Sequence, residues 1–401
     1  MRNHVHILNV REGSLSIMRL QFGFAILLLT IALTNGAMAR DVFVPDDHPT
    51  IGEAINAAAF GDTVYVKPGT YNERIKIKEG VNLVSFAGAD GNDLVDGPGN
   101  KKVLRRTLRT IIDGSGLKTP GYLVSFPQES TAPMRLDGFT IQNLPKYREP
   151  NVFLVEIRAC SPEVVNNIVT GNRSWGGILS TGLGLGMGPP LKIEARPVIR
   201  NNVIYDNYGS GISNAPHAIA LVTDNELFDN RFPGADEAKG ELVGAGIGIR
   251  ESGRPTIENN VCYQNGVGIG GLNLDSHDRE LIIRNNILYN NRTAGIGFRP
   301  ISSEKSNIRA VIENNNVYGN LEGGMRMSKM DSVVIRYNTV SGNKEAGLLF
   351  TNVDEAFIED NEIYGNLTAG IRLLDVPAAT VRRNHIYQNG IAGIDFVGWD
   401  R

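Results

Sequence analysis

The 401-residue chain has little of what marks several common protein classes. It contains two cysteines, which excludes a disulfide scaffold and any cysteine-rich zinc or iron–sulfur site. Its formal charge of −3 gives no basic excess, which argues against a nucleic-acid-binding protein. Its one long apolar run, residues 22–33, is shorter than the roughly 20 residues that a membrane-spanning helix needs. We therefore expect neither a nucleic-acid partner nor a membrane span.

The apolar run has the setting of a secretory signal peptide. It follows the positive start Met18-Arg19 and precedes the small-x-small sequence Ala37-Met38-Ala39, where a signal peptidase would cut. We expect residues 1–39 to be removed and the protein to be exported to the periplasm or the extracellular space. Residues 1–17 add nothing to this pattern, so Met18 is a candidate for the true start.

Glycine and asparagine, in contrast, are abundant, and their positions repeat. The chain has 46 Gly and 39 Asn, and 30 of the Asn lie in residues 151–401. A unit Asn-x-aliphatic-x-x-Asn recurs nine times, and a Gly-aliphatic pair follows nearly every copy. The last three spacings between copies are 23 residues, which indicates a repeat architecture. The first Asn of each unit lies at 167, 202, 225, 260, 286, 315, 338, 361 and 384.

The repeat predicts an all-β solenoid. Apolar residues alternate with period two within each repeat, as in strands, and 23 residues suit one closed coil of three short strands. Coils stacked about 4.8 Å apart would place equivalent Asn side chains in hydrogen-bonded ladders. We therefore interpret the Asn residues as scaffold. Cys262 takes an inward aliphatic position, which predicts a buried thiol.

The chain before the regular repeats predicts a capped beginning of the same solenoid. Thr50-Ile51-Gly52-Glu53 is a capping box, and Ile51, Ala54, Ile55 and Ala58 form one apolar face of a short helix. This helix would cover the open end of the first coil. A basic run at 101–109 is expected to be a solvated loop. The predicted organisation is a signal peptide at 1–39, a cap with irregular coils at 40–137, and regular coils at 138–401.

Three segments in this first part resemble a known superfamily. Residues 44–51, 61–64 and 68–71 are similar to the opening of pectin-lyase-like, right-handed parallel β-helix proteins. The Asn repeats are similar to the short parallel β-helix repeat of that superfamily. The resemblance implies a right-handed parallel β-helix. It implies no single activity, because the superfamily includes lyases, hydrolases, esterases, epimerases and proteins with no known activity.

Departures from the 23-residue spacing predict where a site lies. Longer loops at 181–196, between 230 and 246, near 270–278 and near 300–306 all flank the strand that starts at the Gly-aliphatic pair. Loops on both sides of one row of strands would form the walls of a groove. Along that row the outward or strand-end positions include Arg250, Asn273 and Arg326, which we expect to bind substrate, and Arg299, for which we expect a catalytic role. Guanidinium groups pair well with carboxylates, so the pattern favours an acidic polysaccharide.

The segment 274–279 also resembles the Asp-Pro-His-Asp motif of alginate C5-epimerases, with Ser276 in place of the proline. The resemblance implies catalytic roles for Asp275, His277 and Asp278, with Arg299 one coil away. We expect no cofactor. A calcium ion could neutralise a uronate, as in some lyases of the superfamily, but no acidic cluster has suitable ligand spacing.

Two functions remain open from the sequence. The first is an exported lyase or C5-epimerase that acts on uronate polysaccharide. The second is a noncatalytic β-helix that binds glycan or serves a structural role at the cell surface or in the periplasm. Aromatic residues three positions after the first Asn favour stacking between coils over a sugar-binding platform. The oligomeric state is not indicated.

Overall fold

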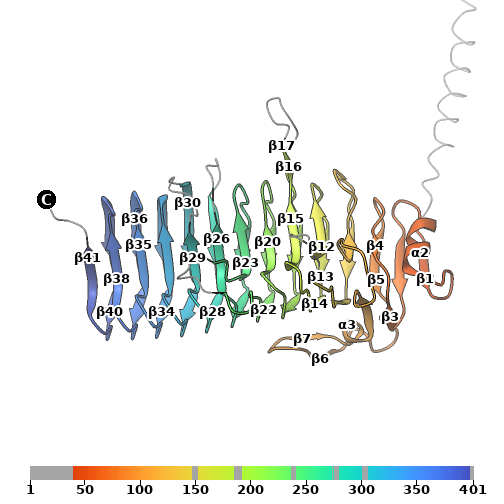
Figure 1. Ribbon diagram of the computed structural model, residues 1–401, viewed down its shortest axis with the longest axis horizontal. Helices are drawn as coiled ribbons and strands as arrows, with labels where there is room; N and C mark the ends of the chain where they lie inside the picture. The colour runs from red at the N-terminus through yellow and green to blue at the C-terminus, as the bar shows by residue number, and fades with distance from the viewer. Residues whose placement is uncertain are drawn as a thin grey trace, which may run out of the picture. The chain divides into compact units, whose positions relative to one another are not determined.

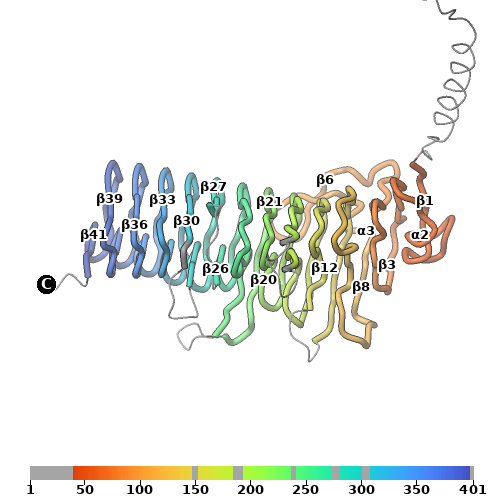
Figure 2. The backbone as a smooth tube through the Cα atoms, turned by 90° about the horizontal axis from the view of Figure 1, so that it is seen from above, coloured from red at the N-terminus to blue at the C-terminus, as the bar shows by residue number. Residues whose placement is uncertain are grey.

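The computed structural model describes residues 39–146, 152–184, 192–235, 241–272, 274, 280–299 and 306–397. Residues Arg40–Arg401 form one compact unit. Three long parallel sheets of 13, 12 and 12 strands, here called sheets A, B and C, run the length of this unit. Successive coils lie side by side along the long axis in Figure 1, and Figure 2 shows the same coils stacked into a solenoid. The prediction of an all-β, right-handed parallel β-helix with three strands in each regular coil is confirmed.

Each sheet takes one strand from successive coils. Sheet A contains β1 (Asp41–Val44), β2 (Thr63–Val66), β5 (Asn82–Ser85), β10 (Arg135–Asp137), β13 (Glu163–Val165), β18 (Val198–Arg200), β21 (Leu221–Thr223), β24 (Thr256–Glu258), β27 (Leu281–Arg284), β30 (Ser306–Glu313), β33 (Met330–Arg336), β36 (Glu355–Glu359) and β39 (Ala378–Arg382). Sheet B contains β3 (Gly69–Tyr71), β8 (Thr110–Asp113), β11 (Thr140–Gln142), β14 (Ile168–Thr170), β19 (Val203–Tyr205), β22 (Glu226–Phe228), β25 (Val261–Tyr263), β28 (Ile287–Tyr289), β31 (Asn316–Tyr318), β34 (Thr339–Ser341), β37 (Glu362–Tyr364) and β40 (His385–Tyr387). Sheet C contains β4 (Ile75–Lys76), β9 (Val124–Ser125), β12 (Phe153–Arg158), β15 (Gly176–Thr181), β20 (Ser210–Asn214), β23 (Ala245–Arg250), β26 (Val267–Leu272), β29 (Ile296–Arg299), β32 (Met325–Ser328), β35 (Leu348–Thr351), β38 (Ala369–Leu374) and β41 (Ala392–Val397).

Two buried asparagine ladders hold the coils together, as the repeat predicted. In the first ladder, the Oδ1 of each Asn accepts the backbone N–H and the side-chain amide of the Asn in the preceding coil. For example, Asn315 Oδ1 accepts from Asn286 N at 2.9 Å and from Asn286 Nδ2 at 3.0 Å. The second ladder, five residues later, repeats this pattern, with Asn320 Oδ1 accepting from Asn291 N at 3.0 Å. Strand alternation places the aliphatic residues and the free Cys262 inside the tube.

The predicted capping helix is present as α2 (Ile51–Ala57). Thr50 Oγ1 accepts the N–H of Glu53 at 3.1 Å, and Ile51, Ala54 and Ile55 are buried against β1, β2 and β4. No helix in the described part of the chain is long and apolar enough to cross a membrane.

The basic run at 101–109 is not a solvated loop. Its second half is α3 (Arg105–Arg109), in which the Arg106 guanidinium is buried and pairs with Asp137 at 2.7 Å. Its first half belongs to a hairpin of β6 (Leu94–Asp96) and β7 (Lys102–Leu104), which runs beside later coils (Figure 1). Among the basic residues of this segment, Arg106 is buried against an aspartate of the neighbouring coil, whereas Lys102 and Arg109 stay exposed to water.

The hairpin is tied to the outer face of sheet B by a carboxylate and by the packing of Val103 against Ile168 and Val203. Glu226 accepts the backbone N–H groups of Asn100 and Lys101, each at 2.8 Å, and the hydroxyl of Tyr263 at 3.0 Å. Burial and the Glu226 carboxylate both raise the pKa of Tyr263. This contact joins β7 to a coil more than a hundred residues further along the chain.

Aromatic rings stack from coil to coil on the same face. Tyr205, Phe228, Tyr263, Tyr289 and Tyr318 lie with centroids 4.9–5.1 Å apart and ring planes within 10° of parallel. The face of each inner ring is therefore covered by the next ring, which leaves no room for a sugar between them. The prediction of stacking between coils is confirmed.

Candidate active-site groove on sheet C

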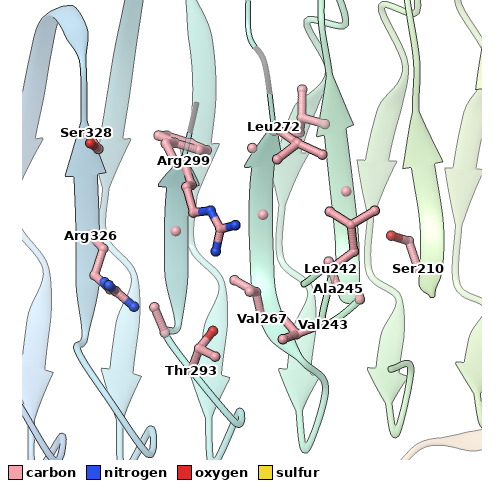
Figure 3. Close-up of a pocket in the computed structure, with 18 of the residues that line it drawn as sticks. Ser210, Leu242, Val243, Ala245, Val267, Leu272, Thr293, Arg299, Arg326 and Ser328 are labelled. Atoms are coloured by element: carbon pink, nitrogen blue, oxygen red, sulfur yellow. The ribbon is translucent and has the colours of Figure 1, made fainter. Parts of the chain in front are cut away.

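An open groove crosses the outer face of sheet C from β20 to β35 (Figure 3). It contains about 1050 Å³ of empty space, part of it open solvent. Because these six strands are spaced about 4.8 Å apart, the groove is roughly 24 Å long. It lies on the row of strands where the longer loops predicted it, and a ligand in it would run across the strands.

The floor of the groove is bare backbone. Gly248, Gly270 and Gly297 occupy the same outward position in β23, β26 and β29. A Cβ on Gly270 would meet its nearest atom at 3.4 Å and one on Gly297 at 3.5 Å, which are ordinary contacts. A Cβ on Gly268 of β26 would instead lie 2.4 Å from the carbonyl oxygen of Gly295. Packing thus demands glycine at 268 but not at 270 or 297, where its effect is to keep the floor low.

Three arginines line this floor, as the sequence predicted. Arg250 and Arg299 share one register position, with Leu272 of β26 between them, and Arg326 lies one strand beyond Arg299. Figure 3 shows the side chains of Arg299 and Arg326 extending over the groove. Arg326 also pairs with Glu322. The three guanidinium groups bring positive charge to one stretch of the groove, and Glu322 and Glu241 offset part of it.

Arg250 is held differently from the other two arginines. Its guanidinium carbon lies 5.2 Å from the centroid of the Trp175 ring, and Trp175 packs edge-on against Phe232 at 5.3 Å. Burial lowers the pKa of Arg250 from its ordinary value, and the nearby charge of Glu251 opposes this shift. An arginine remains protonated in this setting. Its charge is therefore partly stripped of water and is available to a carboxylate.

Sequence reasoning missed the aromatic pair Trp175 and Phe232 at one end of the groove, and it missed Glu241, whose carboxylate lines the groove. Trp175 directly precedes the Gly176-Gly177 pair, and this position next to the groove strand was an available signal. Phe232 and Glu241 line the groove from the longer loop between β22 and β23. That loop also supplies Leu242 and Val243, which form an apolar wall (Figure 3). The described residues of this longer loop therefore form a wall of the groove, as the sequence predicted.

Four of the predicted residues, Asn273, Asp275, His277 and Asp278, lie outside the described residues, so their roles stay predictions. The segment that carries them begins directly after Leu272, which lies between Arg250 and Arg299. Among the described residues, no group of three or more His, Cys, Asp or Glu side chains could hold a metal ion.

Sequence comparison assigns the chain to a family with this fold. The family described as "Right handed beta helix region" matches residues 192–308 and 301–400, which is more than half of the chain. The chain belongs to the right-handed β-helix family. Residues 46–185 also match a family described as "Protein of unknown function (DUF1565)". No curated protein is significantly similar in sequence.

Solved structures of similar fold include enzymes that act on polysaccharides. The A-module of the Azotobacter vinelandii mannuronan C-5 epimerase AlgE6 superposes with a TM-score of 0.57 at 19% identity, over 87% of this chain and 95% of that one. A double mutant of the periplasmic alginate epimerase AlgG gives 0.55 at 13% identity, over 86% and 83%. The catalytic unit of the GH87 α-1,3-glucanase from Streptomyces thermodiastaticus strain HF3-3 gives 0.59 at 17%, over 90% and 66%. At these identities the likeness concerns the fold.

Proposed function

We propose that this protein binds an acidic polysaccharide in the sheet C groove and acts on it as a lyase or C5-epimerase. The observation that carries the proposal is the placement of Arg250, Arg299 and Arg326 along one glycine-floored groove. A pyranose unit is about as long as the spacing between strands, so carboxylates along the sugar chain would reach the arginines of β23, β29 and β32, with the apolar Leu272 of β26 between Arg250 and Arg299. The low floor lets the flat side of the sugar chain approach the backbone.

The arginines would supply the electrostatic part of the reaction. Removal of the C5 proton of a uronate places negative charge on the adjacent carboxylate, and a bidentate guanidinium stabilises that charge. The electron pair left at C5 then either expels the C4 oxygen, giving the lyase product, or takes a proton on the opposite face, giving the epimer. We assign the base and acid to Asp275, His277 and Asp278, which follow Leu272 in the chain. Neither outcome needs a redox cofactor.

The comparisons favour this class of substrate without fixing it. Two of the similar structures are named as epimerases of mannuronan or alginate, which are acidic, whereas the third is named as a glucanase. The arginine-lined groove fits the acidic substrates better, because a neutral glucan offers guanidinium groups no charge. AlgG is described as a periplasmic epimerase. Together with the signal-like segment at 1–39, this supports export of the present chain.

The test is to incubate the purified protein with polymannuronate and with pectate, with and without calcium. Elimination would raise absorbance near 235 nm, and epimerisation would change the anomeric region of the proton NMR spectrum. We expect Arg299→Ala to lower kcat/KM by about a hundredfold or more, the loss usual for a group that stabilises transition-state charge. His277→Ala should abolish turnover.

The matched control is Arg372→Ala. Arg372 occupies the outward register position of Arg326 two strands further on, but it pairs with Asp395 at 2.8 Å and lies outside the groove. It should keep full activity. If neither polymer is converted but both bind the groove, the noncatalytic glycan-binding function replaces the enzyme proposal. If the Arg299 and Arg372 variants behave alike, the groove is not the site.

A further inference from the structure

The aromatic ladder on sheet B is interrupted at one coil. Tyr318 of β31 is in register with Ser341 of β34, and Ser341 is in register with Tyr364 of β37. The rings resume with Tyr364 and Tyr387, whose centroids lie 4.9 Å apart with planes 8° from parallel. We call the position over Ser341, between Tyr318 and Tyr364, the ladder gap. Every coil from β19 to β40 except this one has an aromatic residue at this position.

The two walls of the ladder gap are the rings of Tyr318 and Tyr364. The ring of Tyr318 lies 2° from parallel to that of Tyr289, and the ring of Tyr364 lies 8° from parallel to that of Tyr387. Each ring is therefore stacked on its outer neighbour and turns its other face toward the gap. Two coil spacings separate the walls by about 9.6 Å. A flat ring touching both walls would need only about 7–8 Å, because carbon atoms make contact at 3.5–4.0 Å. The width suits the thicker, puckered ring of a sugar.

The surroundings of the gap are polar or bare. On one side the outward residues of the same three strands are Asn316, Thr339 and Glu362, which offer amide, hydroxyl and carboxylate groups. On the other side each strand is followed by a glycine: Gly319, Gly342 and Gly365. A Cβ on Gly342 would meet no atom within 4 Å, so this side is open.

We propose that the ladder gap is a binding site for one pyranose ring of a neutral glycan, separate from the groove on sheet C. The sugar takes the place of the missing ring, with its C–H faces against Tyr318 and Tyr364 and its hydroxyls toward Ser341, Thr339 and Asn316. A neutral sugar is favoured because the six outward residues of β31, β34 and β37 include Glu362 and no cation. The site on sheet B does not depend on whether the groove is catalytic. It would hold the protein on a glycan while the other face acts.

The test uses NMR of the full protein with ¹³C-labelled tyrosine rings, titrated with hexamers of β-1,4-glucan, β-1,4-xylan and β-1,3-glucan. We expect at least one hexamer to shift the Tyr318 and Tyr364 signals, which are identified by their loss in the alanine variants. Each of these two alanine variants should weaken binding about tenfold. Arg299→Ala, in the sheet C groove, should leave this binding unchanged.

Ser341→Tyr is the decisive variant, because it should fold as well as or better than the parent while filling the gap. Its ring would continue the ladder, so its unfolding midpoint should rise and glycan binding should disappear. Tyr205→Ala is the matched control, since Tyr205 belongs to the ladder but lies several coils from the gap, and it should keep binding. The proposal is overturned if Ser341→Tyr still binds a hexamer, or if indole binds the gap more tightly than every hexamer. It is also overturned if no hexamer shifts either tyrosine signal at about 10 mM, a concentration tenfold above a millimolar Kd.

Discussion

Removing one rung of the asparagine ladder should cost a large part of the stability of the solenoid. Asn315 is 2% exposed, and its side chain forms hydrogen bonds with five partner atoms, its two amide hydrogens being shared among three acceptors. It accepts two from Asn286, and it donates to the Ile283 and Glu313 carbonyls and to Asn338 Oδ1 at 3.0 Å each. Asn315→Ala deletes all of these hydrogen bonds and leaves buried donors and acceptors on both neighbouring coils.

The expected loss follows from these partners. At about 1 kcal/mol net for each of the two accepted bonds and for each of the two amide hydrogens, the loss is about 4 kcal/mol. Asn316→Ala is the stability control, because Asn316 directly follows Asn315 in the chain but is exposed. Its cost should stay within about 0.5 kcal/mol.

Equilibrium urea unfolding followed by circular dichroism measures both variants, and hydrogen exchange locates the damage. Because a solenoid can open locally, the amides of the coils on either side of Asn315 should exchange up to about a thousandfold faster, the equivalent of 4 kcal/mol. A loss below 1 kcal/mol, or equal losses for the two variants, would refute the ladder as the main tie between coils. Exchange that rises evenly along the chain would refute its local action.

Three further predictions concern other contacts. Gly268→Ala should destabilise the fold by more than 1 kcal/mol in urea unfolding, whereas Gly270→Ala on the same strand should leave stability unchanged and reduce binding of uronate polymer; similar stability losses would contradict the account of the groove floor. Hydrogen bonds from the amides of Ala59 and Arg40 hold the pKa of Asp62 below its usual value, so its ionised form stabilises the fold at neutral pH, and this stabilisation is lost as pH falls through the lowered pKa. Asp62→Asn should therefore be less stable than the parent at pH 7, with a difference that shrinks below about pH 4; a difference independent of pH would be evidence against it. Glu226→Ala should release the hairpin of β6 and β7 to limited proteolysis near residues 97–101, with the rest of the fold intact, and unchanged cleavage would show that other contacts suffice.

The sequence predicted those features that every coil must repeat. A buried Asn side chain is satisfied only if the next coil offers the same residue at the same place, so the spacing of Asn315, Asn338 and Asn361 defines the register. The same alternation placed Arg250 and Arg326 outward on the groove strand. Once the aromatic ladder is known, its interruption at Ser341 can also be read from the sequence, because Ser341 stands three residues after Asn338 where most other repeats have Tyr or Phe.

Contacts between loops of different coils could not be predicted in this way. Trp175 and Phe232 meet because two turns 57 residues apart in sequence are neighbours in space, and no periodicity records such a meeting. Arg106 was assigned to solvent because it stands in a basic run, but the fold brings it to Asp137. The sequence shows that a side chain is charged, but whether that side chain is buried depends on whether a neighbouring coil supplies an oppositely charged partner.

The hydrogen bond from Asn100 to Glu226 spans 126 residues, so during synthesis the donor is made long before the acceptor. A solenoid can add coils one after another as its chain emerges, because each coil contacts mainly its predecessor. Val103 can pack against Ile168 of β14 and Val203 of β19 as these strands form, but the hairpin lacks its hydrogen bonds to Glu226 until β22 exists. The docking of the hairpin is therefore completed by a late, long-range step. The hairpin thereby reports that the first half of the helix has been completed.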